Sequence, residues 1–406
     1  MAVMNQPFNG QLGSLLKKLL DSEDYHTLNI AVAFAKNSGV LRIKDSLDNF
    51  RKRGGIVNVY VGVDLGVTSY EALTALLLCT DSLNVVHSEK GQTFHTKIYQ
   101  FEGKEKGIII VGSHNLTGGG LWTNFENSAL IAVDMSNADD IEAMKEQADY
   151  FKKLASLESL FMHINTKDDV DVLLQNNYIS KEVSQQIRSA KVDMKDDDKR
   201  SRLFGNGVPA ALPHLGAPLK EKAPTMLTEL EPGPESDQYK TIWFETRRLT
   251  GGSRNILDLS MKSLVERGDP EGTPFAHTDQ GFMRGGVEFF GINPTDTNIR
   301  KDITLNFEGV DYAQNTILFP VGDNANGTWR LQIKGVSSSG VKITDAFRAK
   351  GEEYYLVMKV VTFTKIEDDY YYISVFPESE LGSFESASRI LARNGSTRTA
   401  KRLGLL

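Results

Sequence analysis

Five polar residues are spaced so that they can meet at the ends of neighbouring strands: His95, Lys97, Ser113, Asn115 and Glu126. A neutral imidazole can attack phosphorus and form a covalent phospho-histidine, which divides a displacement at phosphorus into two steps. A lysine ammonium and an asparagine amide can hold the non-bridging oxygens while negative charge develops on them. Glu126 can accept a hydrogen bond from the second ring nitrogen of His95 and stabilise its imidazolium. These residue types suit transfer at a phosphate, and none of the roles requires a metal or other cofactor.

Two short strands and a charged turn are predicted for the stretch 94–120, "FHTKIYQFEGKEKGIIIVGSHNLTGGG". Alternate side chains of a strand share a face, so His95 and Lys97 are expected to point together. Ser113 and Asn115 end the second strand, "GIIIVG", and Glu126 comes just before the strand "NSALIAV". The strand ends of α/β sheets are where such folds usually place their sites.

The first 165 residues alternate between helical and strand periods. The patterns predict helices at 11–22, 38–55, 68–79 and 137–157, and strands at 27–35, 56–63, 83–88 and 127–133. Alternation of this kind predicts an α/β sheet sandwiched by helices.

The motifs at 95–97 (His-Thr-Lys) and 112–115 (Gly-Ser-His-Asn) resemble the His-x-Lys and Gly-Ser-x-Asn signature of the phospholipase D superfamily. Asn115 stands eighteen positions after the motif lysine and Glu126 eleven after Asn115, a spacing similar to metal-independent restriction endonucleases of the BfiI and NgoFVII kind. Glu102 replaces the Asp of the fuller signature, a loss that the nuclease branch tolerates. The resemblance covers about residues 1–165 and implies a DNA endonuclease that uses a phospho-histidine intermediate.

The histidine count bears on how the leaving oxygen is protonated. In the superfamily that proton comes from a second His-x-Lys motif. None of the other six histidines is followed by Lys two positions on: His26, His87, His114, His163, His214 and His277. One chain therefore supplies half a site, which predicts an isologous homodimer with two His95 side chains facing each other. His114 competes for the role, but its strand parity is opposite to that of Asn115 and is expected to turn it away.

The second half of the chain has different sequence patterns from the first. Residues 166–237 predict a helical and proline-rich linker, and residues 238–406 predict a β-rich domain. The strand patterns fall at 240–249, 287–292, 302–309, 315–321, 328–335, 353–366 and 369–376. Many short strands with few helices favour a barrel or sandwich. The resemblance implies a B3-like pseudobarrel that recognises double-stranded DNA.

Arginines supply the candidate DNA contacts of this second domain. Arg247, Arg248 and Arg254 can reach guanine edges or phosphates, or bond only water and acids in a hairpin. The tail after Glu385 is also basic, with Arg389, Arg393, Arg398, Lys401 and Arg402 and no acid among them. A solvated terminal face is the alternative explanation of that tail.

Composition narrows the class of protein further. The chain has 406 residues, a net charge of −7 and 40% apolar residues, typical of a globular protein of two domains. Its longest apolar runs are too short to cross a bilayer, and no secretion signal opens the chain. A single cysteine, Cys79, suits a reducing cytosol, so a cytoplasmic location is expected.

Three functions remain open from the sequence. The first is a restriction or defence endonuclease; the second is a phospholipase D-type lipid phosphodiesterase, and the third a non-catalytic DNA-binding protein. No Gly-x-x-x-x-Gly-Lys-Ser/Thr loop occurs in the chain. If the first function requires ATP, a separate ATP-driven translocase subunit must bind it, and a methyltransferase is a further candidate partner.

Overall fold

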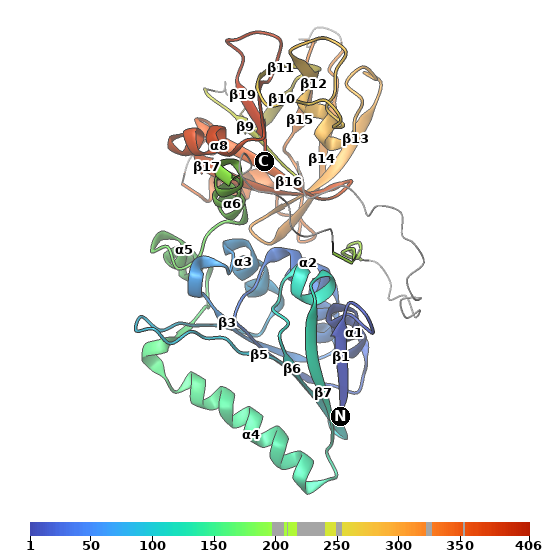
Figure 1. The fold of residues 1–406 in the computed structure, drawn as a ribbon, viewed down its shortest axis with the longest axis vertical. Helices are drawn as coiled ribbons and strands as arrows, with labels where there is room; N and C mark the ends of the chain where they lie inside the picture. Colours follow the sequence, from blue (N-terminus) through green and yellow to red (C-terminus); the bar gives the residue numbers. More distant parts are fainter. Residues whose placement is uncertain (197–206, 209, 217–239, 249–253, 322–326, 352–353) are drawn as a thin grey trace. The chain divides into compact units, whose positions relative to one another are not determined.

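The computed structural model describes residues 1–196, 207–208, 210–216, 240–248, 254–321, 327–351 and 354–406. The described chain divides into two compact units, Met1–Glu182 with 207–216, and 183–196 with 240–406. Each unit is built on one large sheet and also contains helices (Figure 1). The chain is thus of mixed α/β class, as predicted.

The first unit contains an eight-stranded sheet in the order β1-β7-β6-β5-β2-β3-β4-β8. Its strands are β1 (Ala2–Gln6), β2 (Thr27–Val32), β3 (Ile56–Gly62), β4 (Ser82–Val86), β5 (Lys97–Glu102), β6 (Lys106–Gly112), β7 (Glu126–Asp134) and β8 (Phe161–His163). The pairs β2–β3 and β3–β4 are parallel, and the other five pairs are antiparallel. The strands β5, β6 and β7, which carry the candidate residues, are consecutive neighbours.

Helices cover the sheet of the first unit, and two of them begin at a side-chain cap. The helices up to residue 196 are α1 (Leu12–Asp21), α2 (Asn37–Lys52), α3 (Tyr70–Cys79), α4 (Ala138–Ala155), α5 (Lys167–Gln175) and α6 (Glu182–Asp196), with the short turns η1 (Asp64–Gly66), η2 (Gly119–Thr123) and η3 (Glu158–Leu160). Ser69 caps α3 by accepting from the Ala72 N–H, and Asn137 caps α4 by accepting from two N–H groups of its first turn. Such side-chain caps satisfy amide groups that a helix leaves unpaired.

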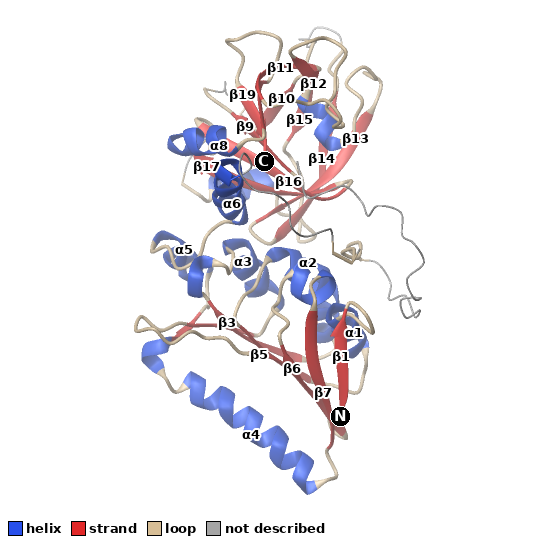
Figure 2. Ribbon diagram, in the orientation of Figure 1, coloured by secondary structure: helices blue, strands red, loops and turns tan. Residues whose placement is uncertain are grey.

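Helices cover both faces of this sheet (Figure 2). The apolar stripes of α1, α2 and α3 pack on one face, where Leu16, Leu47 and Leu73 are fully buried. On the other face Met144 and Phe151 of α4 pack against alternate residues of β5, β6 and β7. Burying each such side chain contributes roughly 1.5–3 kcal/mol, so packing from both sides fixes the strand ends that carry the candidate site.

The second unit contains an eleven-stranded sheet in the order β10-β15-β14-β13-β17-β16-β9-β19-β18-β11-β12. Its strands are β9 (Thr241–Glu245), β10 (Ile256–Leu259), β11 (Lys262–Arg267), β12 (Phe282–Arg284), β13 (Arg300–Phe307), β14 (Val310–Leu318), β15 (Trp329–Gln332), β16 (Lys359–Glu367), β17 (Tyr370–Pro377), β18 (Ile390–Arg393) and β19 (Arg402–Leu405). The helices α7 (Ile343–Arg348) and α8 (Leu381–Ala387) and the turns η4 (Gly286–Phe290) and η6 (Glu378–Glu380) complete it. Within the described residues the sheet ends at β10 and β12 and does not close into a barrel.

One predicted strand of this unit is a turn of 3-10 helix instead. The pattern at 287–292 was typical of a strand, but residues Gly286–Phe290 form η4. Glycines at both ends explain the difference. Gly285 lies so close to the Ser260 carbonyl that a Cβ would meet it at 1.7 Å, and Gly291 ends the turn with φ at +72°. The left-handed conformation of Gly291 suits glycine and stops the chain from extending.

The predicted linker contains ordered structure. Helix α5 belongs to the first unit, whereas Val183, Ile187 and Ala190 of α6 pack in a core of the second unit with Trp243 and Phe384. Trp329 of β15 is fully buried in the core of the second unit. No helix among the described residues is long and apolar enough to span a membrane.

Candidate active site

His95 lies just before strand β5 rather than on it, because the strand begins at Lys97. The two residues are nevertheless joined: the Lys97 ammonium donates to the His95 carbonyl oxygen over 2.9 Å. His95 is exposed, whereas Lys97 is only 8% exposed. Among the described residues neither imidazole nitrogen of His95 has a hydrogen-bond partner, and the ring meets the edge of Phe34 at a centroid distance of 6.5 Å. The imidazole is therefore oriented by packing and free to react.

The segment that carries His95 is fixed by contacts on either side of it. One Asp64 carboxylate oxygen accepts from the Phe94 N–H over 3.0 Å, and the other pairs with His87 Nδ1 at 2.8 Å. The Thr96 hydroxyl shares a 2.7 Å hydrogen bond with the Tyr150 hydroxyl of α4. Sequence reasoning did not single out Asp64. An acid directly after the buried strand 56–63 was the available signal, since such positions face the sheet end.

Asn115 is held by the end of a neighbouring strand. Its Oδ1 accepts from the Phe34 N–H over 3.1 Å, just after β2. The amide Nδ2, which no described residue contacts by a hydrogen bond, remains available as a donor. Phe34 therefore connects the ring of His95 with the amide of Asn115, and the two predicted residues lie at one end of the sheet.

Ser113 and Glu126 interact directly at the same end of the sheet. The Ser113 hydroxyl donates to Glu126 Oε2 and accepts from the Asn127 N–H over 3.1 Å. Asn124 Nδ2 donates to Glu126 Oε1 over 3.3 Å. These four residues thus form a polar cluster at the start of β7.

The predicted hydrogen bond from His95 to Glu126 is not formed among the described residues. Glu126 begins β7, which is separated from β5 by β6, and two strand spacings amount to about 9.6 Å. The charge of Glu126 still acts on Lys97. Burial lowers the pKa of the Lys97 ammonium, and the negative charge of Glu126 partly opposes that effect.

His114, the internal competitor, is buried. It is 1% exposed, its Nδ1 shares a 2.6 Å hydrogen bond with the Ser128 hydroxyl, and its Nε2 has no partner among the described residues. Burial lowers the pKa of His114 to about 4. A neutral imidazole closed off from solvent is a packing element and does not supply a proton to a substrate.

Neither a cysteine nucleophile nor a metal site is found among the described residues. Cys79 is fully buried, and burial raises the pKa of its thiol to about 12, so it is not a nucleophile. Within the described ranges, no three His, Cys, Asp or Glu side chains gather where they could hold a metal ion.

The structure separates the three candidate arginines of the second unit. Arg247 pairs with Glu245 at 2.8 Å. The Arg254 guanidinium lies over the Tyr354 ring, 5.5 Å from its centroid. Arg248 is exposed, and the rest of the predicted reading arm, 249–253, falls outside the described residues.

The basic tail is partly neutralised by acids that lie outside it in the sequence. Arg393 pairs with Glu266 at 2.7 Å, and Arg402 pairs with Glu385. Arg398 is exposed in the loop between β18 and β19. The acid-free stretch read from the sequence is therefore not an acid-free surface.

Comparison with known proteins gives structural similarities only. No family model matches the chain, and no curated protein matches it. Among solved structures it is similar to Nuc, a phospholipase D family member from Salmonella typhimurium, with 16% identity, a TM-score of 0.30, and coverage of 41% of this chain and 97% of that one. It is also similar to NucT from Helicobacter pylori, with 17% identity, a TM-score of 0.27, and coverage of 38% and 94%. A third similar structure is a phosphatidylserine synthase from Haemophilus influenzae, with 14% identity, a TM-score of 0.30, and coverage of 48% and 47%.

Proposed function

We propose that the protein is a metal-independent DNA endonuclease of restriction or defence type, which cleaves phosphodiester bonds through a phospho-histidine. One observation carries the proposal. The exposed imidazole of His95 has no hydrogen-bond partner among the described residues, and it lies beside Lys97 and the Asn115 amide at one end of the sheet. An unpaired imidazole flanked by an ammonium and an amide donor suits nucleophilic attack on phosphorus.

The reaction has two displacements. In the first, a ring nitrogen of His95 bonds to phosphorus, the bond to the leaving oxygen breaks, and that oxygen takes a proton from an acid. In the second, water bonds to phosphorus, the nitrogen–phosphorus bond breaks, and the water proton passes to the same group, now a base. Lys97 and Asn115 stabilise the charge on the non-bridging oxygens in both displacements.

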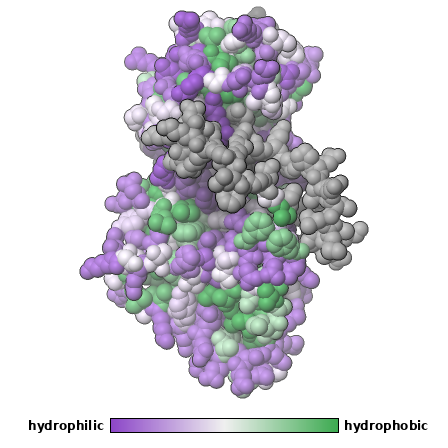
Figure 3. All heavy atoms as spheres, viewed as in Figure 1, coloured by the Kyte–Doolittle hydropathy of each residue, from purple (hydrophilic) through white to green (hydrophobic). Residues whose placement is uncertain are grey.

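A second copy of the chain supplies the acid in this proposal. His114 is buried, and the two His95 side chains of a homodimer would then act as nucleophile and acid in turn. Apolar side chains near Glu126 support an interface there. Phe8 and Phe125 stack at 5.7 Å while 60% and 62% exposed. Figure 3 shows apolar residues exposed between hydrophilic ones on this unit, and patches of this kind often mark protein interfaces.

The second unit is assigned double-stranded DNA recognition, as a B3-like domain in which Arg247, Arg248 and Arg254 are the candidate contacts. The exposed side chains of Arg248 and Arg398 in this unit support the role. A separate ATP-driven translocase or a methyltransferase remains a candidate partner.

The decisive experiment is cleavage of plasmid DNA by the pure full-length protein in EDTA. We expect cutting, and we expect His95→Ala to abolish it while the protein still binds DNA. Sequencing the cut ends tests for a recognition motif, and sedimentation of the same sample should show a dimer. Absence of cutting until a divalent metal is added, or full activity of a monomer, would overturn the proposal.

A further inference from the structure

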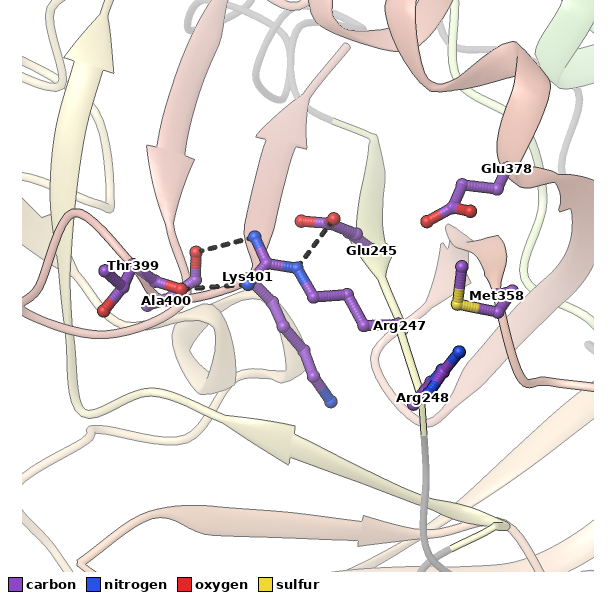
Figure 4. A pocket seen from close by; sticks show the side chains of 8 residues that line it. All are labelled: Glu245, Arg247, Arg248, Met358, Glu378, Thr399, Ala400 and Lys401. Carbon is purple, nitrogen blue, oxygen red and sulfur yellow. Dashed lines mark hydrogen bonds and ion pairs between the residues drawn. The ribbon is translucent and has the colours of Figure 1, made fainter.

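An open pocket of about 680 Å³ lies in the second unit, where β9 ends beside the loop between β18 and β19 (Figure 4). Arg247, Arg248, Met358, Thr399 and Lys401 are among its lining residues. Three of the five are cations, yet they are not equivalent, because their surroundings differ. Their differences identify which of them can bind a ligand.

The Arg247 side chain is committed to the protein itself. Its Nε donates to Glu245 over 2.8 Å, and its terminal nitrogens donate to the carbonyl oxygens of Thr399 and Ala400 over 2.9 and 3.4 Å. Figure 4 shows these bonds as dashed lines from the guanidinium to Glu245 and to the loop. Arg247 therefore holds the loop 394–401 against the end of β9.

Glu245 neutralises the Arg247 charge inside the pocket wall. The carboxylate is 6% exposed, and its second oxygen accepts from the Arg402 N–H over 2.8 Å. Burial opposes ionisation of Glu245, but the Arg247 and Arg402 hydrogen bonds outweigh it and lower the pKa of the carboxyl. The pair remains ionised, and its two charges compensate each other.

Arg248 and Lys401 are the uncommitted cations. Within the described residues neither side chain has a hydrogen bond or ion pair, and both line the pocket. Lys401 extends away from the Arg247–Glu245 pair in Figure 4. Burial lowers the pKa of the Lys401 ammonium and Arg247 acts in the same sense, while the charges of Asp258 and Glu245 oppose the shift without cancelling it. A bound anion would relieve the penalty of holding that charge.

We propose that this pocket binds a phosphate of the DNA backbone through Arg248 and Lys401, and that Arg247 is a positioning residue which fixes the loop. This rests on the proposed function, because it assumes that DNA is the substrate. Glu378 also lines the pocket, and its negative charge would disfavour an anion of higher charge by repulsion. A backbone phosphate is a small monoanion, and contacts to it set the register of a protein on DNA without reading its sequence.

Salt dependence of DNA binding tests the division of roles. Each phosphate contact contributes about −0.9 to the slope of log K against log salt on duplex DNA. We measure binding of a random-sequence 30-base-pair duplex by fluorescence anisotropy from 50 to 300 mM KCl, in a His95→Ala background that prevents cleavage. Arg248→Gln and Lys401→Gln should each reduce the steepness by about 0.9, and the double variant by about 1.8.

Arg247→Gln is the sharpest comparison, since it also removes one positive charge. Because Glu245 already compensates the Arg247 charge, Arg247→Gln should change the slope of log K against log salt by less than half as much as Arg248→Gln does. A double variant of exposed basic residues elsewhere in the unit, Arg300→Gln with Lys342→Gln, controls for net charge and should leave the slope within about 0.3 of the parent. Far-ultraviolet circular dichroism and the urea midpoint verify folding of each variant.

Three results would overturn the inference: unchanged slopes for Arg248→Gln and Lys401→Gln, an equal loss for Arg247→Gln, or an equal loss for the control pair. None of these outcomes touches cleavage, which is measured with His95 intact. Conversely, a protein that binds DNA with the expected slopes but never cuts it keeps the phosphate pocket and refutes the endonuclease.

Discussion

The candidate reacting groups of the first unit and the paired arginines of the second unit have opposite surroundings. At the end of the first sheet, Asn115 is held by a backbone amide and His95 by packing, which leaves the His95 ring and the Asn115 amide donor without hydrogen-bond partners in the part of the chain that the structure describes. In the second unit, Arg247 forms an ion pair with Glu245, and Arg402 forms one with Glu385. A group that reacts with a substrate must lack partners within the protein, whereas a structural cation is paired with neighbouring residues. Freedom from partners, more than residue type, therefore separates the candidate chemistry from the scaffold.

Removing a donor from the first unit should have the largest effect. We expect Asn115→Ala and Lys97→Met to lower the single-turnover rate of DNA cleavage by about 10²–10³-fold, the usual loss when one stabilising donor is removed. DNA affinity should change less than twofold, because these groups act mainly as charge develops. Arg248→Gln should have the reverse effect: it should weaken DNA binding but change the cleavage rate at saturating DNA only slightly. Equal losses of affinity in both units would erase the distinction between them.

The pH dependence of cleavage sharpens the same prediction. Burial lowers the pKa of Lys97, although Glu126 opposes it, so the ammonium loses its proton at a lower pH than an ordinary lysine. The cleavage rate should therefore begin to fall below the ordinary lysine pKa of about 10.4. Lys97→Arg should remove this alkaline decline, since a guanidinium stays protonated. A decline that persists in Lys97→Arg belongs to another group.

Sequence predicted the first unit better than the second, for a physical reason. The positions of His95, Lys97, Ser113, Asn115 and Glu126 follow from short-range patterns, strand ends and a turn, that lie within 32 residues. What sequence missed there depends on three-dimensional contacts: β6 separates Glu126 from β5, and Asp64 reaches Phe94 from the turn after β3. Strand periodicity also misassigned 287–292, where close contact at a glycine decides the backbone.

One ion pair of the arginine surface was not readable from sequence because its two residues lie far apart in the chain. Arg393 and its acid Glu266 lie 127 positions apart, on β18 and beside the bulge of β11. The spacing of basic residues says nothing about such partners. Arg247, Arg248 and Arg254 looked equivalent in one stretch and have three different surroundings in the folded chain.

A smaller effect is expected from His114, which tests whether a motif histidine is structural. The folded pKa is about 4, below the ordinary histidine value of about 6.5. Between these values the unfolded chain binds a proton that the folded chain does not, so the free energy of unfolding falls as pH drops through this window. At a pH below both pKa values, the free energy of unfolding is lower by about 3 kcal/mol than at neutral pH because of this one histidine.

Urea unfolding of the wild type and of His114→Asn at pH 7 and pH 4.5 measures this contribution. Asparagine keeps an acceptor near the Ser128 hydroxyl but cannot titrate, so the variant should lose much less stability on acidification than the wild type. The other six histidines are common to both proteins and cancel in the difference. Parallel losses in the two proteins would mean that His114 is accessible to protons, and it would then return as a candidate acid.

Arg254 should give the smallest effect and completes the comparison within the second unit. Its guanidinium lies over the Tyr354 ring at 5.5 Å, an interaction that contributes about 0.5–1 kcal/mol at partly exposed sites. A double-mutant cycle with Arg254→Met and Tyr354→Leu should recover a coupling of that size in urea unfolding. In the salt titration Arg254→Met should change the slope by less than about 0.3, against about 0.9 for Arg248→Gln. If Arg254→Met reduced the slope as much as Arg248→Gln, stacking on Tyr354 would present Arg254 to phosphate, and the phosphate contacts would extend beyond the pocket.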